Sequence, residues 1–231
     1  MSGFFITGTD TGIGKTTVAV ALIHALRQRG LRVAGMKPVA AGCEWVDGRL
    51  RNDDVRALNA ASNVMADPRL VNPYAFGPPI APHIAAAQAG VRIEIDAIGK
   101  AYAALSAQAD CVVVEGIGGF CVPLGEHCDS SDLAVALGLP VVLVVGLRLG
   151  CLNHALLTAE AIRNRRLPWA AWVGNVLDPG MPGLDESMQA LHQRLPAPCL
   201  GVCPYHPLRV LGVSASEVPW LNPEILTGLY G

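Results

Sequence analysis

A glycine-rich turn near the start of the chain constrains the fold more than any other feature. It reads Gly8-Thr-Asp-Thr-Gly-Ile-Gly-Lys-Thr16. Residues 4–7 before it are apolar enough for a short buried strand, and residues 16–29 after it carry apolar side chains at helical spacing. A strand, a glycine-rich turn and a helix in this order place backbone N–H groups and the positive end of the helix dipole around a phosphate. The turn therefore predicts a nucleotide-binding loop.

Two side chains of this turn have specific expected roles. Lys15 would reach the β- and γ-phosphates of the nucleotide, and Thr16 would bind a magnesium ion. The pattern departs from G-x-x-x-x-G-K-[ST], because Thr9 occupies the position of the first glycine and Gly8 lies one residue earlier. An ordinary glycine-rich turn is the alternative, which the strand-to-helix setting disfavours. We predict a deviant phosphate-binding loop (P-loop).

The rest of the chain alternates apolar runs with helical patterns. Strands are expected at residues 31–36, 111–114, 141–145, 170–173 and 199–202, and helices at residues 93–108, 131–137, 153–165 and 184–195. This order predicts an α/β fold of the P-loop NTPase type, with a mainly parallel sheet and helices on both faces. The glycine- and proline-rich segments 72–82 and 178–183 are too short to link domains, so we expect a single domain over residues 1–231.

Composition bears on the partner and on the compartment. A net charge of −2 supplies no broad basic field, which argues against nucleic acid or an anionic membrane as partner and favours a small molecule. The seven cysteines include no C-x-x-C pair and fit a reducing cytosol. No run resembles a signal peptide or spans a bilayer, so a cytoplasmic protein is expected. The low charged fraction of 16% is also compatible with a subunit interface.

Charged residues directly follow two of the expected strands. Ligands of an open parallel sheet bind at the carboxyl ends of its strands. Lys37 follows residues 31–36 and would place a second ammonium near the transferred phosphoryl group or an anionic substrate. Glu115 follows residues 111–114, where a magnesium ligand opposite a P-loop is needed. An ordinary surface lysine and a buried structural acid are the plainer alternatives.

Other polar positions permit more than one interpretation. Of the pair Asp53-Asp54, one residue would cap a helix and the other would be free to bind metal. Asn153 would begin a helix whose N–H groups bind a carboxylate or phosphate, although plain capping explains it equally well. Asn175 and residues 204–206 follow two further strands, where a nucleotide base would lie.

Several cysteines and histidines invite a metal site that their spacing does not support. Cys121, His127, Cys128 and Asp129 match no common zinc pattern. Two other histidines, His83 and His154, are interpreted as structural or capping residues.

Taken together, the motifs resemble the dethiobiotin synthetase family over nearly the whole chain. The matching segments are residues 8–16, Lys37-Pro38-Val39, Asp54, Val71-Asn72-Pro73-Tyr74, Pro82-His83, residues 115–119 and residues 149–155. The resemblance implies a P-loop α/β homodimer that uses ATP and Mg²⁺. It also implies that one amine of 7,8-diaminononanoate takes up CO2 to form a carbamate, which ATP phosphorylates. The second amine then closes the cyclic urea of dethiobiotin.

The same resemblance implies a role for each matching residue. Lys15 and Lys37 would be catalytic, and Thr16, Asp54 and Glu115 would hold magnesium. Nucleotide binding would involve Gly12, Ile13, Gly14, Lys15, Thr16, Thr17, Asp54, Glu115, Gly116, Ile117, Gly118, Asn175, Val176, Pro204, Tyr205 and His206. Substrate binding would involve Thr11, Lys37, Ala41, Gly150, Cys151, Leu152 and Asn153, the last four positions reaching the substrate carboxylate from the partner subunit.

Three positions depart from the pattern of that family. Gly12 stands where an acid is common, Ala41 where a hydroxyl residue is common, and Leu211 where an acid often approaches the nucleotide. None of these changes removes a lysine or an expected metal ligand. They bear on substrate affinity and on nucleotide preference.

Three rival functions share parts of this pattern. ParA-like switch ATPases share the deviant P-loop but carry a lysine near its start, where this chain has Asp10. Amidating corrinoid synthases add a glutaminase domain, for which 231 residues leave no room. A binding module without catalysis would not need both lysines and all three expected metal ligands. The sequence therefore favours the ligase.

Overall fold

The computed structural model describes residues 3–205 and 220–229, and its centre is a six-stranded sheet. The strand order is β10-β9-β8-β1-β7-β2, and every pairing in this sheet is parallel. The strands are β1 (Gly3–Gly8), β2 (Val33–Met36), β7 (Cys111–Glu115), β8 (Val141–Leu147), β9 (Trp169–Val176) and β10 (Cys199–Cys203). Each strand predicted from an apolar run is present, and the predicted α/β class with a parallel sheet is confirmed.

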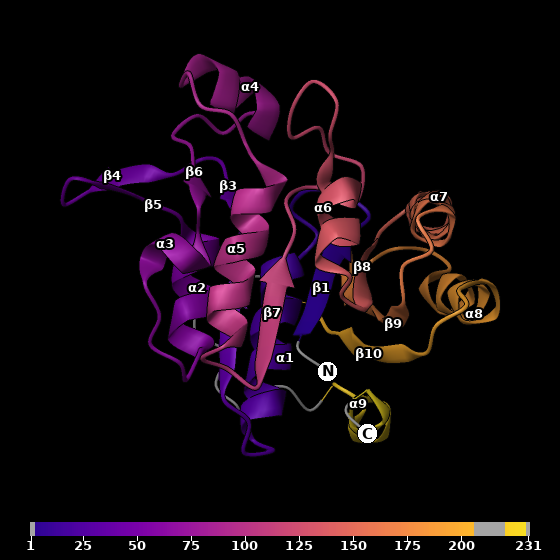
Figure 1. Ribbon diagram of the computed structural model, residues 1–231. Coiled ribbons are helices and arrows are strands. Elements are labelled where there is room, and N and C mark those ends of the chain that lie inside the picture. Colours follow the sequence, from indigo (N-terminus) through magenta and orange to yellow (C-terminus); the bar gives the residue numbers. More distant parts are fainter. Residues whose placement is uncertain (1–2, 206–219, 230–231) are drawn as a thin grey trace.

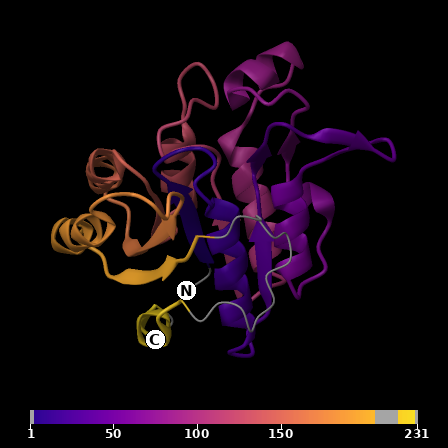
Figure 2. The same ribbon diagram turned by 180° about the vertical axis from the view of Figure 1, so that it is seen from behind.

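Helices cover both faces of the sheet because side chains alternate between the faces along each strand. Phe4 and Ile6 of β1 pack with one layer of helices, while Phe5 packs with the other. The first layer contains α1 (Lys15–Arg27), α2 (Asp53–Ala61) and α9 (Pro223–Gly228). The second contains α3 (Pro68–Val71), α4 (Pro82–Gln88), α5 (Ile95–Ser106), α6 (Ser130–Leu137), α7 (Cys151–Asn164) and α8 (Leu184–Arg194). Figures 1 and 2 show the two layers from opposite sides.

The predicted helices are present with small shifts at their ends, and one shift matters for the site. Asn153 was expected to begin a helix, but α7 begins at Cys151. Gly150 is its N-cap residue and has a φ of 93°, a left-handed conformation that glycine tolerates. Asn153 is therefore the third residue of α7. No helix within the described ranges is long and apolar enough to cross a membrane.

Two small sheets lie outside the central one and were not predicted. A parallel pair joins β3 (Val39–Ala40) to β6 (Tyr74–Ala75). Of these two strands, β6 lies inside segment 72–82, which was expected to be a loop. A hairpin joins β4 (Glu44–Val46) to β5 (Arg49–Arg51) and extends away from the body at the left of Figure 1. Its turn has positive φ at Asp47 and Gly48, the conformation that an Asp-Gly hairpin favours.

Both edges of the central sheet are covered by other parts of the chain. At β2, Ser62 Oγ accepts a hydrogen bond from Gly35 N at 2.9 Å, and Asn63 Oδ1 accepts one from Val33 N at 2.7 Å. At β10, Leu221 bridges Gly201, and Asn222 N donates to Leu200 O at 2.7 Å. Outward-facing backbone groups of both edge strands are therefore hydrogen-bonded within the chain.

Candidate active site

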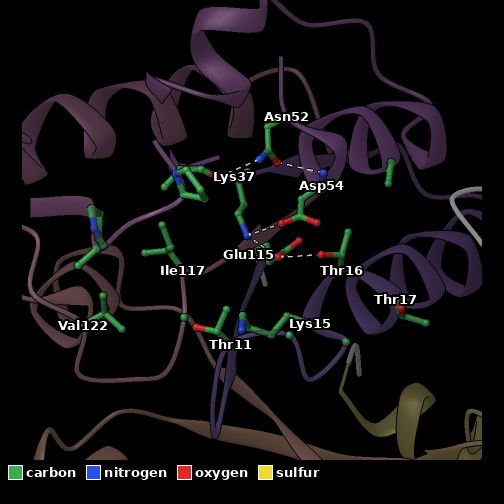
Figure 3. A pocket seen from close by; sticks show the side chains of 18 of the residues that line it. Thr11, Lys15, Thr16, Thr17, Lys37, Asn52, Asp54, Glu115, Ile117 and Val122 are labelled. Carbon is green, nitrogen blue, oxygen red and sulfur yellow. Dashed lines mark hydrogen bonds and ion pairs between the residues drawn. The ribbon is translucent and has the colours of Figure 1, made fainter. Parts of the chain in front are cut away.

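A cleft of about 660 Å³ opens at the carboxyl ends of β1, β2 and β7. Its polar wall comes from the P-loop, from Lys37 after β2, and from the start of α2. Its apolar wall comes from residues 79–82, Ile117 and Val122. Figure 3 shows the lysines and carboxylates converging on the polar side of this cleft. The cleft thus combines a charged end with an apolar one.

The P-loop leaves the first turn of α1 open for an anion. Gly14 is the N-cap residue, with a φ of 91° and no capping side chain. The first N–H groups of the helix thus lack a side-chain cap, which suits them to bind phosphate oxygens. Lys15 Nζ donates to the carbonyl of Asp10 at 2.8 Å, so its ammonium lies against the start of the loop.

Lys37 lies between two carboxylates at the base of the cleft. Its Nζ is 2.5 Å from Glu115 Oε1 and 3.1 Å from Asp54 Oδ2. The hydroxyl of Thr16 donates to the same Glu115 oxygen at 3.0 Å. The side chains of Lys37 and Glu115 are only 5% and 1% exposed, whereas that of Asp54 is 40% exposed. The structure therefore brings all five residues predicted for catalysis or metal binding, including Lys15, into one cleft.

Burial and charge act in opposite directions on these groups. Burial lowers the pKa of Lys15 to about 8, and the nearby Lys37 ammonium contributes to the decrease. Burial would also lower the pKa of Lys37, but Glu115 and Asp54 outweigh it and raise that pKa above its usual value. Burial raises the pKa of the Glu115 carboxyl against the effect of Lys37. Lys37 consequently stays charged despite being buried.

The acids and the hydroxyl fit a magnesium ion in their chemistry. Mg²⁺ prefers oxygen ligands, usually one or two carboxylates together with nucleotide phosphates. Within the described part of the chain, Glu115 Oε2 is buried and accepts no hydrogen bond, so its lone pairs are available. Residues 3–205 and 220–229 contain no group of three or more His, Cys, Asp or Glu side chains arranged to hold a metal. Two carboxylates, Thr16 and a nucleotide would supply the ligands instead.

Asn52 holds the start of α2 and was not predicted as a site residue. Its Oδ1 accepts hydrogen bonds from the backbone N–H groups of Asp54 and Val55, at 3.0 and 3.3 Å. Its Nδ2 donates to the carbonyl of Ala41 at 3.3 Å. One side chain therefore fixes both the carboxylate at position 54 and the backbone at position 41.

Replacing Asn52 with alanine is expected to lower the free energy of unfolding by about 1 kcal/mol, because α2 loses its N-cap. Chemical denaturation of both proteins measures this difference. The control is Asn52→Asp, which keeps an acceptor for the two N–H groups and should remain close to the parent. Equal stability of the alanine variant and the parent would show that the cap contributes nothing.

Comparison with known proteins identifies the chain. A family model described as an AAA domain matches residues 2–210. The ATP-dependent dethiobiotin synthetase BioD of Aromatoleum aromaticum is 55% identical over 217 residues, which cover 93% of this chain and 94% of that protein. The chain belongs to the ATP-dependent dethiobiotin synthetase family. The synthetases of Nitrosospira multiformis, 54% identical over 88% of both chains, and Xylella fastidiosa, 50% identical over 98% of this chain and 95% of that protein, agree. As a dethiobiotin synthetase, the chain is a ligase.

Solved structures with similar folds include P-loop proteins of other functions. The MinD cell division protein of Aquifex aeolicus has a TM-score of 0.56 at 15% identity, over 90% of this chain and 84% of that one. The signal recognition particle 54 kDa protein of Aeropyrum pernix has a TM-score of 0.55 at 17% identity, over 99% of this chain and 48% of that one. At such identities the likeness shows the fold alone, and it confirms the predicted P-loop NTPase type.

In this dethiobiotin synthetase, one of the positions predicted to bind the base, Asn175, contacts the P-loop from outside the cleft. Asn175 is buried, and its Nδ2 donates to the carbonyl of Ile13 at 2.7 Å. Ile13 itself is fully buried and does not line the cleft. Val176 ends β9, and Pro204 and Tyr205 are exposed after β10. His206 and Leu211 lie outside the described residues.

The remaining predicted positions divide between the cleft and α7. Thr11, Gly12, Gly14, Thr17, Ala41, Ile117 and Gly118 line the cleft, and the carbonyl of Gly116 accepts a hydrogen bond from Lys37 Nζ at 3.2 Å. Gly150 and Asn153 are exposed, Leu152 is half-buried, and Cys151 is buried in the core. Residues 150–153 are not among those that line the cleft.

Sequence reasoning missed the apolar wall of the cleft. Pro79, Ile80, Ala81 and Pro82 line it, although this segment was interpreted as a loop. The signal available in the sequence was the number of apolar residues in this expected loop. In the structure, Ile80 remains 37% exposed, and grouped apolar side chains at a surface often mark a binding site.

Proposed function

We propose that this chain converts 7,8-diaminononanoate, CO2 and ATP to dethiobiotin, ADP and phosphate in biotin biosynthesis. It would act in the cytoplasm as a homodimer, with one domain over residues 1–231 and with Mg²⁺. The observation that carries the proposal is the convergence of two buried lysines and two carboxylates at a P-loop. Close similarity to named synthetases over nearly the whole chain supports the same reaction.

The reaction divides into three bond-making steps. One amine of the diamine attacks CO2 and loses a proton, which gives a carbamate. A carbamate oxygen attacks the γ-phosphorus of ATP, and ADP leaves. The second amine attacks the carbonyl carbon, loses a proton and expels phosphate, which closes the five-membered cyclic urea. All three steps place negative charge on oxygens, so fixed positive charge near the P-loop favours each of them.

The two lysines would divide the work of neutralising this charge. Lys15, at the start of α1, would bind the transferred phosphoryl group together with the N–H groups of residues 12–17. Lys37 would face the carbamate oxygens from the other side. Because Lys37 is buried and held by Glu115 and Asp54, its ammonium needs little reorganisation when the substrates bind. Positioning of the reactants supplies the remaining advantage.

Magnesium would be held by Thr16, Asp54 and Glu115. When bound, it would neutralise the β- and γ-phosphate oxygens. The ion would have to share the two carboxylates with Lys37, whose Nζ contacts both of them. The partly exposed Asp54 is the ligand that can turn towards the cleft at the lowest cost.

The diamine would lie along the apolar wall of the cleft. Residues 79–82 and Val122 suit its hydrocarbon chain. Ala41 offers only backbone groups, and Asn52 already binds its carbonyl. As the family resemblance implies, the carboxylate of the diamine would reach residues 150–153 of a partner subunit. These residues do not line the cleft of their own chain.

Purified protein with Mg-ATP and bicarbonate is expected to release ADP only when the diamine is present, with an equal amount of dethiobiotin detected by mass. A monoamine analogue, which lacks the amine that closes the ring, is the control and should yield no cyclic urea. Equal ATP hydrolysis with and without diamine, and no cyclic urea, would refute the ligase function. That result would favour a switch ATPase.

A further inference from the structure

Asp10 in the P-loop is joined to Arg148, the residue that follows β8. Arg148 Nη2 lies 2.5 Å from Asp10 Oδ2, although the two residues are 138 positions apart. Because β1 and β8 are neighbours in the sheet, their carboxyl ends bring these two loops together. The backbone reinforces the contact, since Thr9 N donates to Val144 O at 3.1 Å.

The main-chain groups of the same two residues extend the connection in both directions. The carbonyl of Asp10 accepts the hydrogen bond from Lys15 Nζ, and the carbonyl of Arg148 accepts one from Cys151 N at 3.0 Å. A continuous path therefore runs from the phosphate-binding ammonium to the first residue of α7. The N-cap residue of α7, Gly150, has no side chain to fix the turn, so the turn depends on these contacts.

We infer that Asp10 and Arg148 are positioning residues that hold the start of α7 in register with the P-loop. Their ion pair would set the affinity for the carboxylate end of the diamine. This inference rests on the proposed function, in which residues 150–153 bind that carboxylate. Since they do so for the partner's cleft, the pair connects the nucleotide site of one subunit with the diamine site of the other.

The exposure of the pair makes the inference testable without unfolding the protein. The side chains of Arg148 and Asp10 are 46% and 44% exposed, and such pairs contribute little to overall stability. A small displacement of a binding loop, in contrast, strongly affects how a substrate is oriented. Loss of the pair should therefore change substrate use and leave the fold intact.

A matched ion pair provides the control. Arg32 Nη2 lies 2.7 Å from Asp110 Oδ1, with side chains 61% and 38% exposed. This pair lies just before β2 and β7, at the opposite ends of the strands from the cleft. Arg32→Gln and Arg148→Gln thus remove equivalent surface ion pairs at opposite ends of the parallel strands.

The experiment measures kcat and the KM values for ATP and diamine in both variants, with Tm as a check of folding. Arg148→Gln is expected to raise the diamine KM about fivefold, because a displaced binding loop orients the substrate less well. Its KM for ATP and its Tm should stay at the parental values. Arg32→Gln should change none of these quantities.

Charge exchange then tests whether the two residues act as a pair. Asp10→Asn should raise the diamine KM as Arg148→Gln does, and the double variant Asp10→Arg, Arg148→Asp should recover most of the loss. An unchanged diamine KM in Arg148→Gln, an equal change in Arg32→Gln, or no recovery in the double variant would overturn the inference. If the parent protein makes no dethiobiotin, the proposed function fails and the inference fails with it.

Discussion

Replacing Lys37 with alanine is expected to lower the rate of dethiobiotin formation by about a thousandfold, the usual cost of removing a buried charge-stabilising group. Lys37 Nζ lies between Glu115 and Asp54, and burial excludes water that could replace it. The measurement is the single-turnover rate of ring closure at saturating ATP. Nucleotide binding should largely persist, because the P-loop and Lys15 are unchanged.

The sequence provides a matched control for this substitution. It contains three lysines, of which Lys15 and Lys37 lie in the cleft and Lys100 is exposed on α5. Lys100→Ala removes one equivalent charge and should retain parental turnover. Near-parental turnover in a folded Lys37→Ala protein would exclude Lys37 from the mechanism.

Loss of stability must be separated from loss of catalysis in this experiment. Removing Lys37 leaves the buried Glu115 without its ion-pair partner, which typically costs about 3–5 kcal/mol. Lys37→Arg keeps a positive charge beside the carboxylate and should unfold closer to the parent. The arginine variant should still turn over slowly, because its larger planar head group cannot place one nitrogen at all three contacts of the Lys37 ammonium, with Glu115, Asp54 and the Gly116 carbonyl. Parental turnover in the arginine variant would show that charge alone is sufficient.

Replacing Gly14 with alanine is expected to weaken nucleotide binding about a hundredfold, which corresponds to roughly 2.7 kcal/mol. Two costs combine at this position. A φ of 91° is unfavourable for any residue with a Cβ. The new Cβ would also overlap the Asn175 amide, which is buried and bound to the carbonyl of Ile13. Nucleotide affinity measured by calorimetry tests the expectation.

Two further variants separate the strain from the overlap. Gly30 lies outside the P-loop and has a similar φ of 83°, and a Cβ there would meet nothing within 4 Å. The decrease in the free energy of unfolding of Gly30→Ala therefore measures the cost of the backbone conformation alone. The double variant Gly14→Ala, Asn175→Ala removes the overlap and should recover part of the affinity. Parental affinity in Gly14→Ala would show that the loop adapts and that Asn175 does not restrain it.

The features that could be predicted from the sequence are those that depend on residues close together in the chain. The P-loop lies within nine positions, and each apolar run that was interpreted as a strand lies in a strand of the central sheet. Lys37 and Glu115 were found because each directly follows such a run, and parallel strands bring their carboxyl ends to one edge. Asp54 was found less securely, since the adjacent Asp53 has the same chemistry.

The features that sequence could not predict depend on contacts between distant residues. Nothing near Arg148 in the sequence indicates that it meets Asp10, because the contact follows from the strand order. The start of α7 was misplaced because Asn153 has the side chain of a cap, whereas Gly150 provides the required φ instead. The hairpin at β4–β5 was missed although its Asp-Gly turn was visible. Its strands are mostly exposed and lack the alternation that marks a buried one.

The covered edges of the central sheet restrict how two copies of this chain can associate. Ser62 and Asn63 occupy the outward N–H groups of β2, and the segment around Leu221 bridges β10. A strand from another molecule would have to displace these groups before it could pair. The proposed homodimer would thus form without extending the central sheet from one subunit into the other. The same protection makes the central sheet a poor template for strand-by-strand aggregation.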